Sequence, residues 1–442
     1  MNIDTLIHAR WIIPLEPEET VYENYAIAIK DDKIKEILKS NDARKKYTAK
    51  EELDLKNHAI IPGLINSHTH AGMSLFRGLA NDLPLMDWLN NYIWPAEKKW
   101  VSSEFVMDGT KLAIAEMLRS GTTCFNDMYF FPNITAEACV NTGMRAVIGL
   151  IVMNLSTAWA NNSEQYLTKG EAVHDKYKHN PLIRTAFAPH APYTVFNESL
   201  KKISFLAEEL DIPIHMHVHE TEDEINQSIK EFGKRPLERL AELDLLSSRL
   251  IAVHMTQLNN KEIDMLKKYE VNIVHCPESN LKLASGFCPV DKLLNHKINV
   301  SIGTDSTASN NDLDMIGEMR TTALLAKGVS RNHTSCNAYT TLKMATYNAA
   351  VALGLDKSIG SLKKGKQADI VAIDLGKLET MPVYDSISHI IYSGGREQVS
   401  DVWVAGKRLL KNKELTTLNM DELKNKVNLW EKEIKNSELK NI

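Results

Sequence analysis

Two histidines one residue apart, His68 and His70, are the feature of this chain best suited to chemistry. They follow an apolar run at residues 59–66 that is typical of a β-strand. Because successive side chains of a strand point to opposite faces, both imidazoles would lie on one face and could bind one divalent cation. The same pattern also occurs at ordinary polar strand ends, so other residues have to support a metal site.

Further potential ligands and acids also follow apolar runs. They are the segment 215–220 after residues 212–214, His254 after residues 250–253, and Asp305 after residues 298–304. Short apolar runs with polar ends are typical of buried strands in a parallel sheet. Active sites of (β/α)8 barrels lie at the carboxyl ends of the strands, so this placement favours a barrel.

The alternation of strands and helices along the chain predicts the same fold. Eight candidate strands, each followed by a segment with helical periodicity, are residues 59–66, 121–126, 145–152, 183–189, 213–219, 249–253, 271–275 and 298–304. Such a pattern predicts right-handed βαβ units that close into an α/β fold, a TIM-like (β/α)8 barrel.

Both ends of the chain contain short strands with turn residues. We expect residues 1–56 and 358–415 to pair into one small β-sandwich domain, and residues 57–357 to form the catalytic barrel. Residues 416–442 are highly charged, with apolar residues at helical spacing, which predicts a helical tail on the surface.

Composition excludes several classes of partner. The formal net charge of −5 over 442 residues gives no basic field for nucleic acid. The N-terminus lacks the features of a signal peptide, and no run of about eighteen apolar residues could span a bilayer, so we expect a cytoplasmic protein without membrane contact. Five scattered cysteines fit free thiols in a reducing compartment. A homo-oligomer is expected from base rates.

His68, His70, one histidine of residues 215–219 and Asp305 could hold one metal ion. Three neutral imidazoles and a carboxylate favour zinc, with Fe(II) and Mn(II) as alternatives. The metal would supply hydroxide near neutral pH, and Asp305 would also accept the proton of the bound water.

Two more residues fit the same chemistry. His254 could orient the hydroxide, and Glu220 could act as the general acid that protonates a ring nitrogen while the neighbouring carbon is attacked. A binuclear site would need a bridging acidic group or a modified lysine late in the fourth strand. Residues 183–189 contain neither, so a single metal is expected.

Residue types alone leave the third histidine ligand open among His215, His217 and His219. If the strand stops near Val218, His217 is the inward ligand and Glu220 lies in the following loop. Without such an end or a bulge, Glu220 would point to the opposite face of the strand.

Seven motifs are spread along nearly the whole chain: PGLINSHTH at 62–70, FRGL at 76–79, WPAE at 94–97, GTT at 121–123, HVHET at 217–221, GTD at 303–305 and AAVALG at 349–354. They resemble the amidohydrolase superfamily, and within it the 5-methylthioadenosine/S-adenosylhomocysteine deaminase family. The resemblance implies four metal ligands, which are His68, His70, His217 and Asp305. It also implies that His254 positions the hydroxide and that Glu220 is the acid.

The resemblance further implies hydrolytic deamination of an adenine nucleoside, giving the inosine analogue and ammonia. Glu97 stands where the family holds ribose hydroxyls, His190 where a histidine contacts substrate, and Trp88 where an aromatic wall is expected. One carboxylate can accept two vicinal hydroxyls. The alternatives are a salt bridge of Glu97 to Lys98 or Lys99, and a purely supporting hydrogen bond for His190.

The chain departs from the family near residues 149 and 161, where members typically carry arginines. It has Gly149 and Asn161 instead. Arg145 lies at the start of the same predicted strand, too early in the chain to replace them. In the family these arginines meet the 5′ substituent, especially a homocysteine carboxylate. We therefore expect a neutral, adenosine-like 5′ group to be favoured over S-adenosylhomocysteine.

Two other functions are alternatives to adenine nucleoside deamination. One is an amidohydrolase that deaminates or dechlorinates another amino-heterocycle, of the guanine or triazine type. Glu97 argues against it, because a bare heterocycle has no ribose to hold. The other is a barrel that has lost its metal and serves as a scaffold, which the presence of all four ligands with Glu220 and His254 disfavours.

Overall fold

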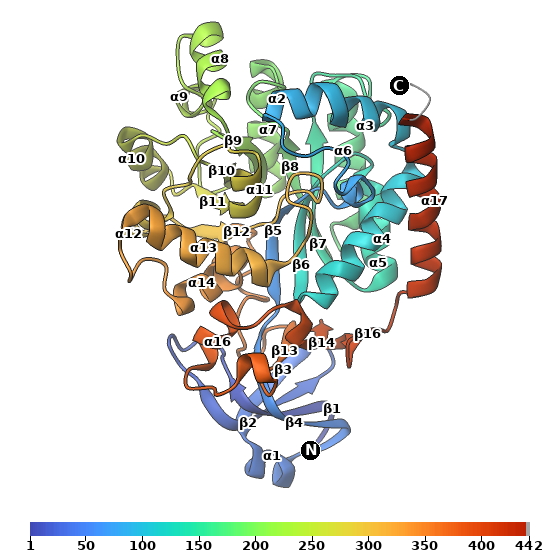
Figure 1. Ribbon diagram of the computed structural model, residues 1–442, viewed down its shortest axis with the longest axis vertical. Helices are drawn as coiled ribbons and strands as arrows, with labels where there is room; N and C mark the ends of the chain where they lie inside the picture. The colour runs from blue at the N-terminus through green and yellow to red at the C-terminus, as the bar shows by residue number, and fades with distance from the viewer. Residues whose placement is uncertain (439–442) are drawn as a thin grey trace.

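Two sheets organise the molecule (Figure 1). The computed structural model describes residues 1–438. One sheet contains eight parallel strands surrounded by helices, and the other contains eight strands from both ends of the chain. The predicted TIM-like barrel and the predicted small β-structure from both chain ends are therefore confirmed.

The barrel strands are hydrogen-bonded in chain order. They are β5 (Leu64–Thr69), β6 (Thr122–Met128), β7 (Arg145–Val152), β8 (Ile183–Pro189), β9 (Ile214–Val218), β10 (Leu250–His254), β11 (Asn272–His275) and β12 (Val300–Ile302). A parallel bridge between Thr69 and Asp305 joins the first strand to the residues after the last one. This bridge closes the barrel.

The first predicted strand needs a correction. Residues 59–62 end β4 (Thr48–Pro62) of the second sheet, and the barrel strand begins only at Leu64. The chain passes between the sheets at Gly63, where a Cβ would lie 1.9 Å from the Thr123 hydroxyl, so this approach requires glycine. Both strands are buried here, and hydropathy therefore shows no break.

Helices connect the barrel strands and cover the barrel (Figure 1). In chain order they are α4 (Ser103–Arg119), α5 (Pro132–Thr142), α6 (Ser163–Tyr177), α7 (Asn197–Leu210), α8 (Glu222–Phe232), α9 (Pro236–Glu242), α10 (Asn260–Lys268), α11 (Pro277–Lys282), α12 (Val290–Asn295), α13 (Met315–Ser330), α14 (Ala338–Met344) and α15 (Tyr347–Ala352). Polar N-caps fix several starts. Asn162, Thr221 and Asn259 each accept a hydrogen bond from the N–H three residues later.

The connection from β5 to β6 is unusually elaborate. Before α4 it forms η1 (Ala71–Phe76), α2 (Leu85–Trp88), a π-helix η2 (Leu89–Ile93) and α3 (Trp94–Trp100). Single π-helical turns are rare and occur mostly at functional sites. None of the described helices has both the length and the apolar character needed to cross a bilayer.

The second sheet has the strand order β16-β15-β14-β13-β4-β1-β2-β3. Besides β4 it contains β1 (Asn2–Ile12), β2 (Tyr22–Lys30), β3 (Lys33–Lys39), β13 (Ile370–Asp374), β14 (Val399–Val404), β15 (Lys407–Lys411) and β16 (Glu414–Leu415), with α1 (Ser40–Lys46), η3 (Leu378–Thr380), α16 (Ser386–Tyr392) and η4 (Arg396–Gln398) in its connections. The sheet curls on itself, so its edge strand β3 reaches the segment that precedes β13. There the Ile34 N–H donates to the Lys366 carbonyl at 2.9 Å, and the Ile34 carbonyl accepts from the Gly365 N–H at 2.8 Å.

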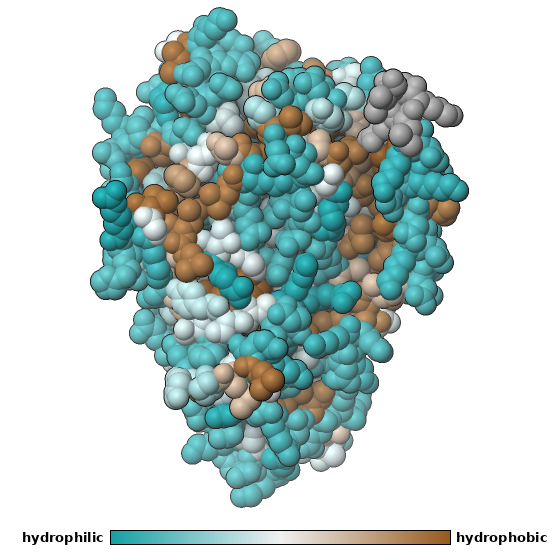
Figure 2. Space-filling model, viewed as in Figure 1, coloured by the Kyte–Doolittle hydropathy of each residue, from teal (hydrophilic) through white to brown (hydrophobic). Residues whose placement is uncertain are grey.

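The predicted tail is a helix, α17 (Met420–Glu438), and it packs on the barrel. The Trp430 ring meets the Phe105 ring edge-on at a centroid distance of 5.3 Å. Asp108, buried in α4, accepts hydrogen bonds from Lys426 Nζ (2.9 Å) and Trp430 Nε1 (3.1 Å). Apolar side chains lie beside the hydrophilic outer face of this helix (Figure 2).

A buried ion pair joins the barrel to the second sheet. Arg145, the first residue of β7, donates to Asp369 through Nε (2.8 Å) and Nη2 (3.1 Å). The Asp369 carboxylate also accepts from the Ala405 N–H at 2.7 Å, and the two charged residues are only 4% and 3% exposed. Arg145 is therefore committed to the sheet interface at the amino end of its strand.

We expect Asp369→Asn to lower the free energy of unfolding by ~3 kcal/mol, because the Arg145 charge stays buried without its partner. Urea denaturation measures the change. A double variant with Arg145→Met and Asp369→Leu removes both charges and should recover part of the loss. Equal destabilisation by the single and the double variant would contradict this account.

Candidate metal centre

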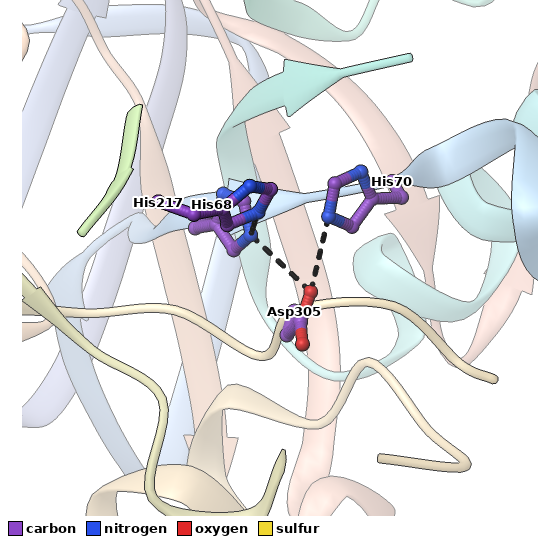
Figure 3. A group of neighbouring side chains, drawn as sticks. All are labelled: His68, His70, His217 and Asp305. Atoms are coloured by element: carbon purple, nitrogen blue, oxygen red, sulfur yellow. Dashed lines mark hydrogen bonds and ion pairs between the residues drawn. The ribbon is translucent and has the colours of Figure 1, made fainter. Parts of the chain in front are cut away.

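Four side chains meet at the carboxyl ends of the barrel strands (Figure 3). They are His68 and His70 at the end of β5, His217 of β9, and Asp305 after β12. Their ligating atoms all lie within 4.8 Å of one another. Oδ1 of Asp305 is 3.2 Å from Nε2 of both His68 and His70, and Nε2 of His217 is 3.1 Å from Nε2 of His68. Such convergence of three imidazoles and one carboxylate forms a potential metal site.

Each histidine of this group uses its other ring nitrogen for a hydrogen bond that fixes the ring. The partners of Nδ1 in His68, His70 and His217 are, in turn, the His215 ring (2.9 Å), the Met128 carbonyl and the His190 carbonyl (2.8 Å). Hydrogen bonds at the outer nitrogen are typical of metal-binding histidines.

Burial disfavours the charged form of two of these imidazoles, whereas the contact with Asp305 raises the pKa of the third, His70, despite its burial. Burial lowers the pKa of His68 to about 4, and it lowers the pKa of His217 well below the ordinary imidazole value. Only a neutral imidazole has a lone pair for a metal, so both side chains are ready to bind at neutral pH.

Asp305 is held in one orientation by two hydroxyl groups. Ser279 Oγ donates to Oδ2 at 2.6 Å and Ser309 Oγ donates to the same atom at 2.7 Å. Oδ1 is therefore the oxygen that faces the histidines. Asp305 also has a φ of 65°, a left-handed conformation that is rare outside glycine and clusters at functional sites.

Of the three histidines in residues 215–219, the cluster contains His217. His215 lies behind His68 and bonds to its ring, whereas the His219 ring points away and accepts from the Leu237 N–H at 3.2 Å. β9 ends at Val218, as one of the two sequence interpretations required.

Glu220 and His254 lie beside this cluster. His219 has a φ of 55°, and this left-handed turn directs Glu220 toward the pocket. Nε2 of His254 is 3.8 Å from Oε2 of Glu220, and Nδ1 of His254 is hydrogen-bonded to Oδ1 of Asn280 at 2.8 Å. Burial raises the pKa of the Glu220 carboxyl.

The remaining predicted residues line the same pocket. Trp88 and Glu97 come from α2 and α3, on either side of the π-helix, and His190 follows β8. Among the described residues Glu97 forms no ion pair with Lys98 or Lys99. Burial in the pocket raises the pKa of Glu97 to about 7, although a hydrogen bond with the Tyr129 side chain lowers this pKa in part.

The profile of the amidohydrolase family matches residues 59–409. The chain belongs to the amidohydrolase family. It is 49% identical to a 5-methylthioadenosine/S-adenosylhomocysteine deaminase of Saccharophagus degradans, over 98% of this chain and 97% of that protein. It is 41% identical to a 5′-deoxyadenosine deaminase of Methanosphaera stadtmanae, over 90% of this chain and 92% of that protein.

A solved structure gives the same result for the fold. An adenosine deaminase from Xanthomonas campestris with bound zinc shares 47% identity with this amidohydrolase, with a TM-score of 0.97 over 98% of this chain and 99% of that one. The family and these relatives confirm the resemblance inferred from the motifs, and they support the predicted enzyme class, a hydrolytic deaminase.

The structure explains why this amidohydrolase has no arginine at residue 149. A Cβ on Gly149 would lie 2.2 Å from the Asp127 carbonyl oxygen, so no side chain fits there. Further along the same strand and just after it, the pocket is lined by the apolar Ile151 and Met153. Asn161 is exposed, and its backbone N–H donates to the Gln165 side chain (3.1 Å).

Several pocket residues were not found from the sequence. Tyr129 directly follows β6 and Tyr193 lies shortly after β8, so the strand-end argument that found His254 could have found the first of them. Ser279, in α11, and Ser309 carried no signal, because serine is a common residue and only its contact with Asp305 makes it informative.

We expect His217→Ala to weaken metal binding strongly, because it removes one of the four potential ligands of a site whose remaining side chains are placed for four. Elemental analysis after dialysis should find ~1 ion per chain in the wild type and far less in the variant. His174→Ala, which alters a half-buried histidine of α6 outside the pocket, is the matched control and should keep its metal. Equal metal contents in all three proteins would show that the cluster does not bind the ion.

Proposed function

We propose that this amidohydrolase deaminates an adenine nucleoside by hydrolysis, giving the inosine analogue and ammonia. The observation that carries the proposal is one pocket that contains the potential metal ligands, Glu220 and His254 at one end and Glu97 at its wall. The names of the three relatives reported above, at 41–49% identity, support it over the alternative of another amino-heterocycle, because each refers to an adenine nucleoside.

The four clustered residues would hold one divalent ion, for which zinc is favoured over Fe(II) and Mn(II). The donor set of three imidazoles and one carboxylate oxygen fits zinc, and the solved relative contains it. When bound, such an ion supplies an activated water near neutral pH.

The protein side chains then move the protons. Asp305 takes the proton of the attacking water, and His254 orients the oxygen toward carbon 6 of the purine. Glu220 donates a proton to ring nitrogen 1, and burial favours its protonated form by raising its pKa. Asp305 then passes the proton it took to the amino group, the proton of the added hydroxyl returns to Glu220, and the bond between carbon 6 and the amino nitrogen breaks to release ammonia.

Other residues that line the pocket would bind the sugar and the base. Glu97 accepts hydrogen bonds from the two ribose hydroxyls, His190 contacts the substrate, and Trp88 forms part of the aromatic wall. The apolar Ile151 and Met153 would face a neutral 5′ substituent, which favours 5′-deoxyadenosine and 5′-methylthioadenosine over S-adenosylhomocysteine.

Other properties are also proposed from the sequence. They are a domain division at residues 1–56, 57–357, 358–415 and 416–442, a cytoplasmic location, a homo-oligomer, and the absence of nucleic acid and membrane partners. Their support is the composition and strand pattern described above.

A substrate series tests the proposed activity. We expect metal-replete protein to release ammonia from adenosine, 5′-deoxyadenosine and 5′-methylthioadenosine with kcat/KM at least ~100-fold above that for adenine and guanine, equal to ~3 kcal/mol in the transition state. S-adenosylhomocysteine should rank below the neutral nucleosides, because burying its charged end against apolar residues is costly. Reaction of free bases alone would refute the substrate class, and a preference for S-adenosylhomocysteine would refute only the 5′ assignment.

The pH dependence of KM tests the role of Glu97. With a pKa of about 7, this carboxyl loses its proton as the pH rises from 6 to 8, and the ionised form accepts both ribose hydroxyls. KM for a nucleoside should therefore fall by about tenfold over this range. The matched variant Glu97→Gln cannot ionise and should show a flat KM, while Glu97→Ala should raise KM for nucleosides and not for adenine. The same slope in the Gln variant would contradict the ribose contact.

A further inference from the structure

The turn after β9 decides where Glu220 points. β9 ends at Val218, and His219 takes a φ of 55°, which costs energy for any residue other than glycine. Without this turn the Glu220 side chain would continue the alternation of the strand and leave the pocket. Other groups of the protein have to hold the strained turn in place.

Glu224, in the first turn of α8, binds the turn through both of its carboxylate oxygens. The His219 N–H donates to Oε1 at 3.0 Å and the Glu220 N–H donates to Oε2 at 2.7 Å. The residue is 6% exposed, so these hydrogen bonds form away from water, and burial raises the pKa of Glu224 to about 8.

These contacts are not an ordinary helix cap. The N-cap of α8 is Thr221, whose hydroxyl already accepts from the Glu224 N–H at 3.3 Å. The two N–H groups that the Glu224 side chain binds belong to residues that precede the helix. Its carboxylate therefore acts on the turn that carries Glu220.

Thr256 binds the two backbone carbonyl groups of the same turn. Its Oγ1 donates to the Glu220 carbonyl at 2.7 Å, and its backbone N–H donates to the His219 carbonyl at 3.0 Å. The backbone of Glu220 is thus held at its N–H and at its C=O by two different elements, α8 and the loop after β10.

We propose that Glu224 is a positioning residue that directs the Glu220 side chain at the substrate, with Thr256 as the second holding point. The inference rests on the proposed function, in which Glu220 is the proton donor. Misplacing a reacting group by about 1 Å can cost ~100-fold in rate, so loss of this hold should act on turnover.

Steady-state kinetics of the metal-replete protein tests the proposal. We expect Glu224→Gln to lower kcat between about ten- and a hundredfold, with KM within about threefold of wild type and an unchanged metal content. In a Glu220→Gln background the same change should have no further effect on kcat, because its target is already absent. An equal fold-loss in both backgrounds, or wild-type kcat in Glu224→Gln, would overturn the proposal.

Three further comparisons separate positioning from folding and from the proposed function. Asp369→Asn, another buried carboxylate that accepts a backbone N–H, should lower stability without changing kcat. If Glu224→Gln does not fold, Thr256→Val should lower kcat and Thr256→Ser should restore it, and an unaffected Val variant would refute the inference. Wild-type kcat in Glu220→Gln would refute the proposed general acid itself.

Discussion

Closure of the barrel between its first and last strands is the constraint on which the site depends. The Asp305 N–H donates to the His68 carbonyl at 3.0 Å, and Asn66 binds Thr304 through both its amide atoms (2.7 and 3.0 Å). Gly303 allows the contact, because a Cβ there would lie 2.7 Å from the backbone nitrogen of His68. A pairing of residues more than two hundred positions apart in the chain thus places the carboxylate of the cluster next to its histidines.

The strand ends around this closure share one local property. His219, His254 and Asp305 all adopt left-handed backbone conformations. Each such residue costs of order 1–3 kcal/mol and persists only where its surroundings determine it. Here the surroundings include hydrogen bonds between the ends of neighbouring strands, such as the one from the Thr256 N–H to the His219 carbonyl. Each strand end therefore fixes the backbone of the next one. Stability of the barrel and geometry of the site are therefore coupled.

Specificity comes from parts of the chain outside the barrel strands as well. The segment with the π-helix carries Trp88 and Glu97 over the strand ends, whereas Ile151 and Met153 line the side of the pocket at the end of β7. At residue 149 of that strand no side chain fits, because the Asp127 carbonyl oxygen approaches too closely. The same pocket thus has a carboxylate on one segment and apolar side chains on another, which the proposed function assigns to the sugar and to its 5′ substituent.

The amino-acid sequence by itself determined the barrel, the eight strand positions to within a few residues, and the metal-binding residue types, because buried strands and ligands have distinct side chains. It left the third histidine open, since His215, His217 and His219 differ only in where the strand ends. It also missed the break at Gly63 and the supporting roles of Ser279, Ser309 and Glu224. Those depended on contacts between distant segments, and only the packing of the folded chain brings such groups within hydrogen-bonding distance.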